Sequence, residues 1–388
     1  MTAVPASERL RVLHLDHTGV AGGAEFALVR MLHARAPWSA VVLVPPGARG
    51  GIFSGLVPVV VIREHGVRQP AGVSRGGVRA VVEATGRLLV QALSTRAHRA
   101  FRTADVVDAN TARSAAYGAI AAWTARTAFV VHIRDMADAT ALGRVGALIM
   151  TRLVLPRADG VVTDTRAALD STAPFLRADA VTAVIPSASG LRLTRPHPRA
   201  PGPLRVGMLA RIDPWKGQEL LLEAFAAAFA DGDERLDLAG SAPFGHATFL
   251  RHLRARAIEL GVADRVTFHG HVDDVDRLLE EWDVAVQYST RPEPLGQNVL
   301  QYLAAGRATI VADEGGPTEW VEDGMNGLRV TPRDVISLAS ALRLLADDER
   351  LREALGQAAR RTPGLLDDAA VADAHFTFYA RVRSVAGR

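Results

Sequence analysis

The chain lacks cysteine entirely, and this absence limits its chemistry. None of its 388 residues is a cysteine, which excludes disulfides, thiol nucleophiles and thiolate metal ligands. No stretch of about 20 residues is both apolar and free of charge, so no membrane-spanning helix is expected. The N-terminal segment MTAVPASERLRVLHLD carries Glu8 and Arg9 ahead of its apolar run and lacks a signal-peptide layout. These absences predict a soluble, cytoplasmic protein.

Lysine is nearly absent, although positive charge is plentiful. Of the 45 lysines and arginines only one is a lysine, Lys216. An ammonium group is a compact charge on a flexible stem, whereas a guanidinium is a wide planar fork. A solitary lysine in this background suggests a position that arginine cannot fill, with chance survival as the alternative.

The length and the net charge of the chain limit its number of domains and its kinds of partner. A chain of 388 residues with 48% hydrophobic content can bury two cores, which predicts two domains of roughly 150–200 residues. The formal net charge is only +3, from 45 basic and 42 acidic residues. This near balance gives no support for nucleic acid as a partner.

Apolar, β-branched runs alternate with helical patterns along the first half of the chain. Segments such as 25–36 and 113–126 place apolar residues at helical spacing. The alternation predicts an α/β fold, with a parallel sheet covered by helices on both faces. The candidate strands are residues 11–16, 39–44, 57–62, 106–109, 128–133, 160–163 and 180–185.

A proline-rich segment, residues 192–204, interrupts this alternation and is interpreted as a linker. The alternation then restarts, with helices expected at 218–229 and 297–305. Two doubly wound halves of similar size make the cleft between them the default ligand site. The candidate strands of the second half are residues 204–209, 236–239, 266–269, 284–288, 309–312 and 328–330.

The loop after the candidate strand 204–209 carries two cations. Arg211 and Lys216 lie between this strand and the helix expected from residue 218. Cations at the carboxyl end of a strand, beside a helix N-terminus, favour a phosphate-like anion. A solvated charged loop is the alternative, but the position of the only lysine favours phosphate binding.

Two further loops place ligand-binding groups at the ends of strands. Glu293 follows strand 284–288, and Gly296 opens a helix that carries Gln301, an arrangement suited to polyhydroxyl groups. The alternative for Glu293 is a charge that complements the helix dipole. Gly315 and Gly316 follow strand 309–312 and would let a ligand approach the backbone closely.

The first half shows similar features. Gly22 and Gly23 precede a helix, but they match neither the dinucleotide-binding spacing Gly-x-Gly-x-x-Gly nor a P-loop. His132 ends strand 128–133 and is followed by Arg134, while Asn110 ends strand 106–109. Strand-end positions favour residues that face a cleft, with a structural histidine as the alternative for His132.

These motifs, in this order, resemble the family 4 retaining glycosyltransferases of GT-B fold, and the resemblance covers nearly the whole chain. It implies two Rossmann-like doubly wound domains facing across a cleft, residues 1–195 on the acceptor side and 204–365 on the donor nucleotide-sugar side. Residues 366–388 would return as a helix to the first domain. The resemblance is carried by GGAE (22–25), NTARSAAYG (110–118), HIRD (132–135), GMLARIDPWKG (207–217), LAG (238–240), FHG (268–270), EPLGQNVLQYLAAG (293–306) and EGGPTEWVEDGMNG (314–327).

The resemblance also implies roles for single residues. Arg211 and Lys216 would hold the donor diphosphate and stabilise the leaving group, Glu293 would contact the donor sugar, and His132 would lie beside that sugar. No metal and no permanently bound cofactor are implied, so the acidic run of Asp273, Asp274 and Asp276 is interpreted as a solvated face. The other donor-binding residues would be Gly22, Gly23, Gly296, Gln297, Asn298, Gln301, Gly315 and Gly316, with Asn110 and Arg134 on the acceptor side.

The implied function is transfer of a hexose-type sugar from a nucleotide-diphosphate sugar to an acceptor hydroxyl, with retention of configuration. One departure concerns Gln301, which stands where the family has the second glutamate of its Glu-x7-Glu motif. An amide loses a charge-assisted hydrogen bond of about 1.5–3 kcal/mol and keeps a neutral one of about 0.5–1.5 kcal/mol. The alternative function is therefore a non-catalytic or donor-hydrolysing sugar-nucleotide-binding protein.

The acceptor is left open between a saccharide, a lipid carrier and a small metabolite. One clue is a basic stretch, residues 66–104, with seven arginines and a single acid, Glu83. Its part 78–101 has helical periodicity and would suit an anionic membrane at the inner face or an acidic acceptor. The alternative is a helix that faces the core and has a basic outer side.

Overall fold

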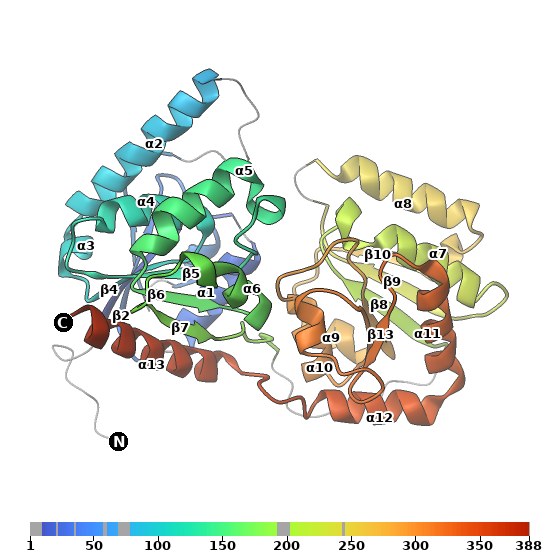
Figure 1. Cartoon of the computed structure of the whole chain (residues 1–388). Helices are drawn as coiled ribbons and strands as arrows, with labels where there is room; N and C mark the ends of the chain where they lie inside the picture. Colours follow the sequence, from blue (N-terminus) through green and yellow to red (C-terminus); the bar gives the residue numbers. More distant parts are fainter. Residues whose placement is uncertain are drawn as a thin grey trace. The chain divides into compact units, whose positions relative to one another are not determined.

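The chain divides into two compact units. The computed structural model describes residues 10–387 except 21, 35, 57–59, 69–77, 192–201 and 243–244. Unit 1 comprises Met1–Ala188 and Leu366–Arg388, and unit 2 comprises Ser189–Leu365 (Figure 1). Most of the expected linker, residues 192–204, lies outside the described residues.

Unit 1 is built on a parallel sheet of seven strands in the order β3-β2-β1-β4-β5-β6-β7. Strands β4, β5 and β6 are buried along their whole length, which explains why their sequences are continuous apolar runs rather than alternating ones. The strands are β1 (Arg11–Leu15), β2 (Ser39–Val44), β3 (Val61–Glu64), β4 (Val106–Ala109), β5 (Ala128–Ile133), β6 (Gly160–Thr163) and β7 (Val181–Val184).

Helices cover both faces of this sheet. Neighbouring strand residues such as Val130 and Val131 enter two different cores, because side chains alternate across a strand. Helices α1 (Gly23–His33) and α13 (Asp368–Ala386) close one core, and α2 (Val78–Ala97), α4 (Ala112–Ala122) and η2 (Met150–Val154) close the other. The remaining elements are η1 (Ile52–Leu56), α3 (Arg99–Thr103), α5 (Ala139–Ile149), η3 (Leu155–Arg157), α6 (Arg166–Thr172) and η4 (Ala173–Phe175).

Unit 2 repeats the design with six parallel strands in the order β10-β9-β8-β11-β12-β13. The strands are β8 (Arg205–Leu209), β9 (Arg235–Ala239), β10 (Val266–Gly270), β11 (Val284–Gln287), β12 (Ala308–Ala312) and β13 (Leu328–Val330). The helices are η5 (Pro214–Lys216), α7 (Gln218–Ala228), α8 (Ala247–Glu259), η6 (Ala263–Arg265), α9 (Val275–Glu280), α10 (Gln297–Ala304), η7 (Gly316–Glu319), α11 (Val335–Asp347) and α12 (Glu349–Ala359). The expected class, two doubly wound parallel sheets, is confirmed.

Two sequence expectations need adjustment. The strand expected at 57–62 is β3 at Val61–Glu64, because residues 52–56 form η1 and the pairing with β2 begins only at Val61.

Within the described residues, Ala139–Arg157 is long and apolar enough to cross a membrane, judged by length and composition alone. This segment does not meet the criterion of a charge-free apolar stretch used in the sequence analysis, because it contains Arg144 and Arg152.

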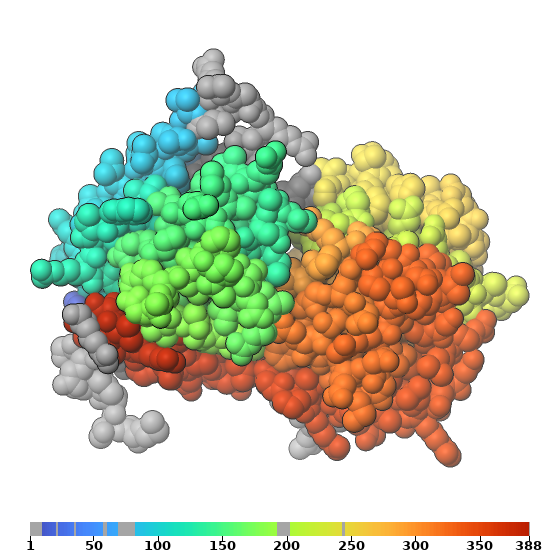
Figure 2. All heavy atoms as spheres, in the orientation of Figure 1, coloured from blue at the N-terminus to red at the C-terminus, as the bar shows by residue number. Residues whose placement is uncertain are grey.

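The last helix, α13, packs on the rest of unit 1 (Figure 2). A chain of buried polar side chains joins it to the sheet. The Tyr379 hydroxyl donates to Asp108 Oδ2 at 3.0 Å, and His14 Nδ1 donates to the same oxygen at 2.9 Å. Trp38 Nε1 donates to His14 Nε2 at 3.2 Å, which fixes the proton of His14 on Nδ1. The chain therefore joins α13 to β4 and β1 in the centre of the unit.

Replacing Tyr379 with phenylalanine should destabilise unit 1. The change leaves the buried Asp108 carboxylate with one hydrogen-bond donor fewer, at a cost of about 1.5–3 kcal/mol. Chemical unfolding followed by circular dichroism measures the effect. Thr377→Ala removes an exposed hydroxyl from the same helix and serves as the control, with an expected change within about 0.5 kcal/mol. Equal stability of the two variants would contradict the anchoring role of Asp108.

Candidate functional site

Three loops of unit 2 meet at one edge of its sheet. They follow β8, β11 and β12, which are neighbours in the sheet, so the carboxyl ends of these strands lie side by side. The backbone N–H of Thr290 donates to the carbonyl of Trp215 at 2.8 Å, and that of Gly316 donates to the carbonyl of Glu293 at 2.7 Å. Main-chain hydrogen bonds thus join the first loop to the second and the second to the third.

Gly217 allows the close approach of the first two loops. Its φ is 80°, and a Cβ there would lie 1.8 Å from the carbonyl oxygen of Tyr288. Any side chain would push the loops apart, so glycine is required for both its backbone conformation and its size. The neighbouring Lys216 is thereby held against the loop that contains Glu293.

Lys216 and Glu293 form an ion pair at this junction. Lys216 Nζ donates to Glu293 Oε1 at 2.8 Å, and the same oxygen accepts from Gln287 Nε2 at 3.0 Å and from the Ser289 hydroxyl. Burial alone would raise the pKa of Glu293, but the Lys216 ammonium and these hydrogen bonds hold it below its usual range. Glu293 is therefore a carboxylate at neutral pH.

Trp215 contributes an aromatic surface to the same site. The Lys216 ammonium lies 4.0 Å from the centre of the Trp215 ring, and the Arg291 guanidinium lies 4.1 Å from it. Both distances are well inside the range of cation–π attraction. The indole therefore helps to fix the position of the lysine.

Arg211 lies on the same loop as Lys216 but is far more accessible. Its side chain is 48% exposed and approaches Asp213 at 3.9 Å, whereas the side chain of Lys216 is 15% exposed. The Gln218 amide donates to the Arg211 carbonyl at 2.7 Å and fixes the backbone beneath it. The loop thus presents one held cation and one accessible cation.

The start of α10 has both structural and accessible polar groups. Asn298 Nδ2 donates to the Leu209 carbonyl at 3.1 Å and lies 3.2 Å from the Tyr302 hydroxyl, so this amide ties α10 to the end of β8. Gln297 and Gln301 are half-buried and one helical turn apart, and thus share a face of α10. Gly296, with φ 73°, is the N-cap of the helix.

The two glycines after β12 allow the third loop to pack against the second. A Cβ on Gly315 would lie 2.7 Å from the Glu293 carbonyl oxygen, and a Cβ on Gly316 would lie 2.1 Å from that of Pro294. These glycines were expected to admit a ligand to the backbone. The structure shows that they admit the backbone of the Glu293 loop, so they position Glu293.

In unit 1, a chain of hydrogen bonds links the ends of five neighbouring strands. Asn110, after β4, donates to Asp16 Oδ2 at 2.7 Å and accepts from Arg134 Nη2 at 3.0 Å. Arg134, after β5, also donates to the Ser187 hydroxyl at 3.2 Å and lies 3.5 Å from Asp164. Asn110 and Arg134, both expected on the acceptor side, are therefore in direct contact.

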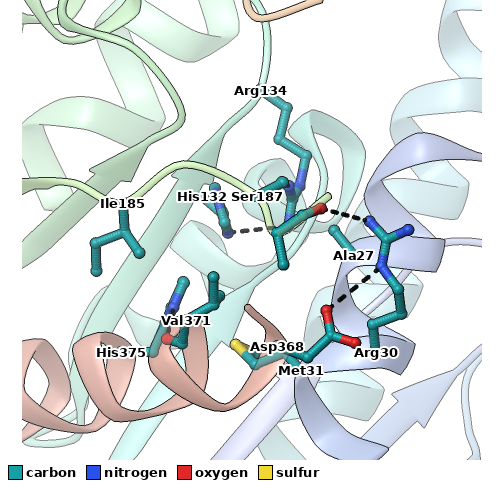
Figure 3. A pocket seen from close by; sticks show the side chains of 11 residues that line it. Ala27, Arg30, Met31, His132, Arg134, Ile185, Ser187, Asp368, Val371 and His375 are labelled. Atoms are coloured by element: carbon teal, nitrogen blue, oxygen red, sulfur yellow. Dashed lines mark hydrogen bonds and ion pairs between the residues drawn. The ribbon is translucent and has the colours of Figure 1, made fainter. Parts of the chain in front are cut away.

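His132 lies inside unit 1, next to a small pocket (Figure 3). Its side chain is only 5% exposed, its Nδ1 accepts from Arg134, and its ring lies 5.5 Å from that of His375 on α13. Burial and then the charge of Arg134 lower the pKa of His132, so its imidazole is neutral at pH 7. In this arrangement His132 supports Arg134 and α13 rather than presenting its ring to solvent.

The glycine-rich loop of unit 1 lies over a carboxylate pair. A Cβ on Gly22 would lie 2.5 Å from Glu25 Oε2, whereas Gly23 is exposed and unobstructed. Burial and then the charge of Glu25 raise the pKa of Asp16 to about 7. Among the described residues, Asp16, His17 and Glu25 place three possible metal-ligand atoms within 4.8 Å of one another.

In the acidic run of unit 2, Asp274 caps α9 and Asp273 is almost fully exposed.

Comparisons with known proteins identify the second unit. Residues 192–362 match the family model described as Glycosyl transferases group 1. Unit 2 is a glycosyl transferases group 1 domain. Over 159 residues the chain is 34% identical to a D-inositol 3-phosphate glycosyltransferase of Jonesia denitrificans, covering 39% of this chain and 37% of that protein. Over 184 residues it is 34% identical to a GDP-mannose-dependent mannosyltransferase of Mycobacterium tuberculosis, covering 43% of this chain and 47% of the relative.

The fold of the whole chain recurs in solved structures of glycosyltransferases. The crystal structure of Anabaena HepE in complex with UDP and glucose has a TM-score of 0.75 at 23% identity, covering 96% of this chain and 99% of that one. A sucrose-phosphate synthase from Thermosynechococcus elongatus has a TM-score of 0.80 at 20% identity, covering 97% and 100%. The expected GT-B-type pair of Rossmann-like domains is therefore confirmed as a fold.

Within the group 1 domain, the structure brings Lys216 and Glu293 into contact and places Gly315 and Gly316 behind Glu293. Sequence reasoning missed three contributors to this site, which are Trp215, Gln287 and Ser289. The position of a tryptophan beside the only lysine was a usable signal. Gln287 and Ser289 gave no signal, because their role depends on how the loop after β11 folds back.

The carboxylate pair of unit 1 predicts a pH dependence of stability. The pKa of Asp16 is about 7 in the folded protein and 3.8 in a free side chain, so stability should fall as pH rises from about 4 through 7. Glu25→Gln removes the neighbouring charge and should reduce this fall. Thermal unfolding at pH 5 and pH 8 measures it, with the exposed Glu83→Gln as the control. An unchanged pH dependence in Glu25→Gln would contradict the coupling.

Proposed function

We propose that the chain is a family 4 glycosyltransferase that moves a hexose-type sugar from a nucleotide-diphosphate sugar to an acceptor hydroxyl, with retention of anomeric configuration. The group 1 match of unit 2 supports the class of enzyme. The names of the relatives, one inositol phosphate glycosyltransferase and one GDP-mannose-dependent enzyme, support a nucleotide-sugar donor. UDP and glucose in the HepE crystal structure agree with that donor class.

The single observation that carries this proposal is the contact between Lys216 and Glu293. An ammonium group has three N–H donors, of which Glu293 takes one, so the others can bind phosphate oxygens. Glu293 keeps Oε2 for a sugar hydroxyl, because Lys216, Gln287 and Ser289 all donate to Oε1. One ion pair thus offers a cation for the diphosphate and a carboxylate for the sugar.

Arg211 completes the proposed charge stabilisation. As the bond between the sugar and the diphosphate breaks, negative charge grows on the departing phosphate. Lys216 is held in place and Arg211 is accessible on the same loop, so both can neutralise that charge. We propose that these two cations allow transfer without a metal ion or a permanently bound cofactor.

Unit 1 would supply the acceptor side. Asn110 and Arg134 lie at adjoining strand ends, and Gly23 leaves the start of α1 open. Arg134, whose side chain is 15% exposed, would contact a hydroxyl-bearing acceptor, and the buried Asn110 would hold Arg134 in position. The second candidate function, a sugar-nucleotide-binding protein that hydrolyses its donor or is inactive, is favoured by Gln301 alone.

Lys216→Ala should lower turnover of the donor by about two to three orders of magnitude, the usual cost of losing one stabilising donor in a transition state. Release of nucleoside diphosphate from a panel of nucleotide sugars, with and without candidate acceptors, measures it. Arg350→Ala removes an exposed cation from α12 and should leave turnover unchanged. Wild-type turnover in Lys216→Ala would disprove the proposed role, and release without any transfer product would favour the hydrolytic alternative.

Gln301→Glu should strengthen donor binding. A carboxylate accepts a charge-assisted hydrogen bond from a ribose hydroxyl, worth about 1 kcal/mol more than an amide, or roughly a fivefold lower Kd. Isothermal titration with the nucleoside diphosphate measures the change. Gln357→Glu, which makes the same change at an exposed position of α12, is the matched control. If both variants bind equally, position 301 does not contact the ribose.

A further inference from the structure

The outer side of α2 carries an apolar stripe. Val82, Gly86, Leu89, Val90 and Leu93 are all exposed, with Val82 at 64% and Leu93 at 68%. Their spacing of four, three, one and three residues places them on one side of the helix. The opposite side is already buried, through Gln91, Ala92 and Thr95. The stripe is therefore a second apolar face, beyond the one that the core requires.

Helix α5 is apolar and almost unburied. None of the residues in Ala139–Ile149 is buried, and the valine and leucine at 145 and 148 are 67% and 59% exposed. The segment Ala139–Arg157 has the length and composition of a membrane span. However, Gly143 interrupts the helix with φ 72° and ψ 161°, and Met150, Val154 and Leu155 are buried in the core. The segment is thus anchored in unit 1 at one end and exposed at the other.

Both helices lie on the same side of unit 1. The core that contains Ala92 of α2 also contains Met150 and Val154 of η2, which continues α5, whereas α13 belongs to the core on the other face of the sheet. Helix α4 packs between α2 and η2. Figure 1 shows α2 and α5 along the side of unit 1 opposite α13. We call the exposed apolar residues of α2 and α5 the α2–α5 face.

The charge of this region is mostly positive. Residues 78–103 and 139–157 contain eight arginines and one acidic residue, Glu83. Arg99, Arg102, Arg144 and Arg152 are exposed. An anionic lipid bilayer has negatively charged head groups at its surface and apolar acyl chains beneath them. Exposed apolar side chains with arginines nearby are complementary to both layers.

We propose that the α2–α5 face binds the surface of an anionic lipid bilayer, with both helices lying in the interface. The break at Gly143 and the burial of Met150, Val154 and Leu155 fit a helix that lies in the interface, not one that spans. Apolar side chains would enter the acyl boundary, and the arginines would pair with lipid phosphates. If the chain is the glycosyltransferase proposed above, its acceptor is carried by a lipid; that consequence depends on the proposed function, whereas the binding surface does not.

Vesicle co-sedimentation with the full chain tests this proposal. The protein should pellet with vesicles of phosphatidylcholine and phosphatidylglycerol at low salt, and much less at high salt or with phosphatidylcholine alone. The double variants Leu89→Ser/Leu93→Ser and Val145→Ser/Leu148→Ser should each weaken binding at least about tenfold. Ile258→Ser/Ile336→Ser removes apolar side chains of similar exposure from α8 and α11 and should bind like the wild type.

A variant that changes only exposed arginines tests binding without altering any apolar side chain. Arg99→Gln/Arg102→Gln leaves the apolar faces intact and should lose binding to anionic vesicles. Absence of pelleting at low salt, or unchanged binding in the stripe and charge variants, would overturn the proposal. So would a dimer, seen by light scattering, that the stripe variants abolish, since a second copy would then cover this face. Donor binding is measured without vesicles, so its failure would count against the proposed function alone.

Discussion

The proximity of two unlike charges in unit 2 governs how its loops are built. Removing an ammonium and a carboxylate from water is costly, and a buried ion pair is weak evidence for stability. Here the cost is met by several groups at once, since Gln287, Ser289 and the Trp215 ring also contact the pair. Gly217 and Gly315 permit the loop approaches that bring these groups together. The loops are therefore better explained as supports for two charged groups than as connections between strands.

The same logic in unit 1 produces a more buried network. Asp16, Asn110, Arg134 and Asp164 stand at the ends of adjoining strands, and nearly all are inaccessible. Hydrogen bonds between buried polar groups restrict the side chains that share them. Arg134 is the link to α13, because it supports His132, whose ring faces His375. The helix that ends the chain thus helps to fix side chains at the edge of the first sheet.

The sequence predicted the strands because buried parallel strands are continuous β-branched runs, as in residues 106–109 and 128–133. The role of Glu293 at the donor site came only from the resemblance, since spacing alone left it undecided, and the contact of Glu293 with Lys216 was not predicted. The burial of His132 could not be predicted, because it depends on His375 from the opposite end of the chain. Likewise, the periodicity of residues 78–101 revealed a helix but not which of its two apolar faces the core would cover.

The geometry around Glu293 also explains why this one position keeps a lysine in a chain of arginines. Three donors converge on Oε1, from Lys216, Gln287 and Ser289. A guanidinium binds a carboxylate best as a planar fork that uses both oxygens, which would displace the neighbouring donors and occupy Oε2. An ammonium is a compact charge that fits among them and leaves its remaining N–H groups and Oε2 available. Under the proposed function, in which Glu293 serves a ligand as well as a cation, this position therefore requires lysine.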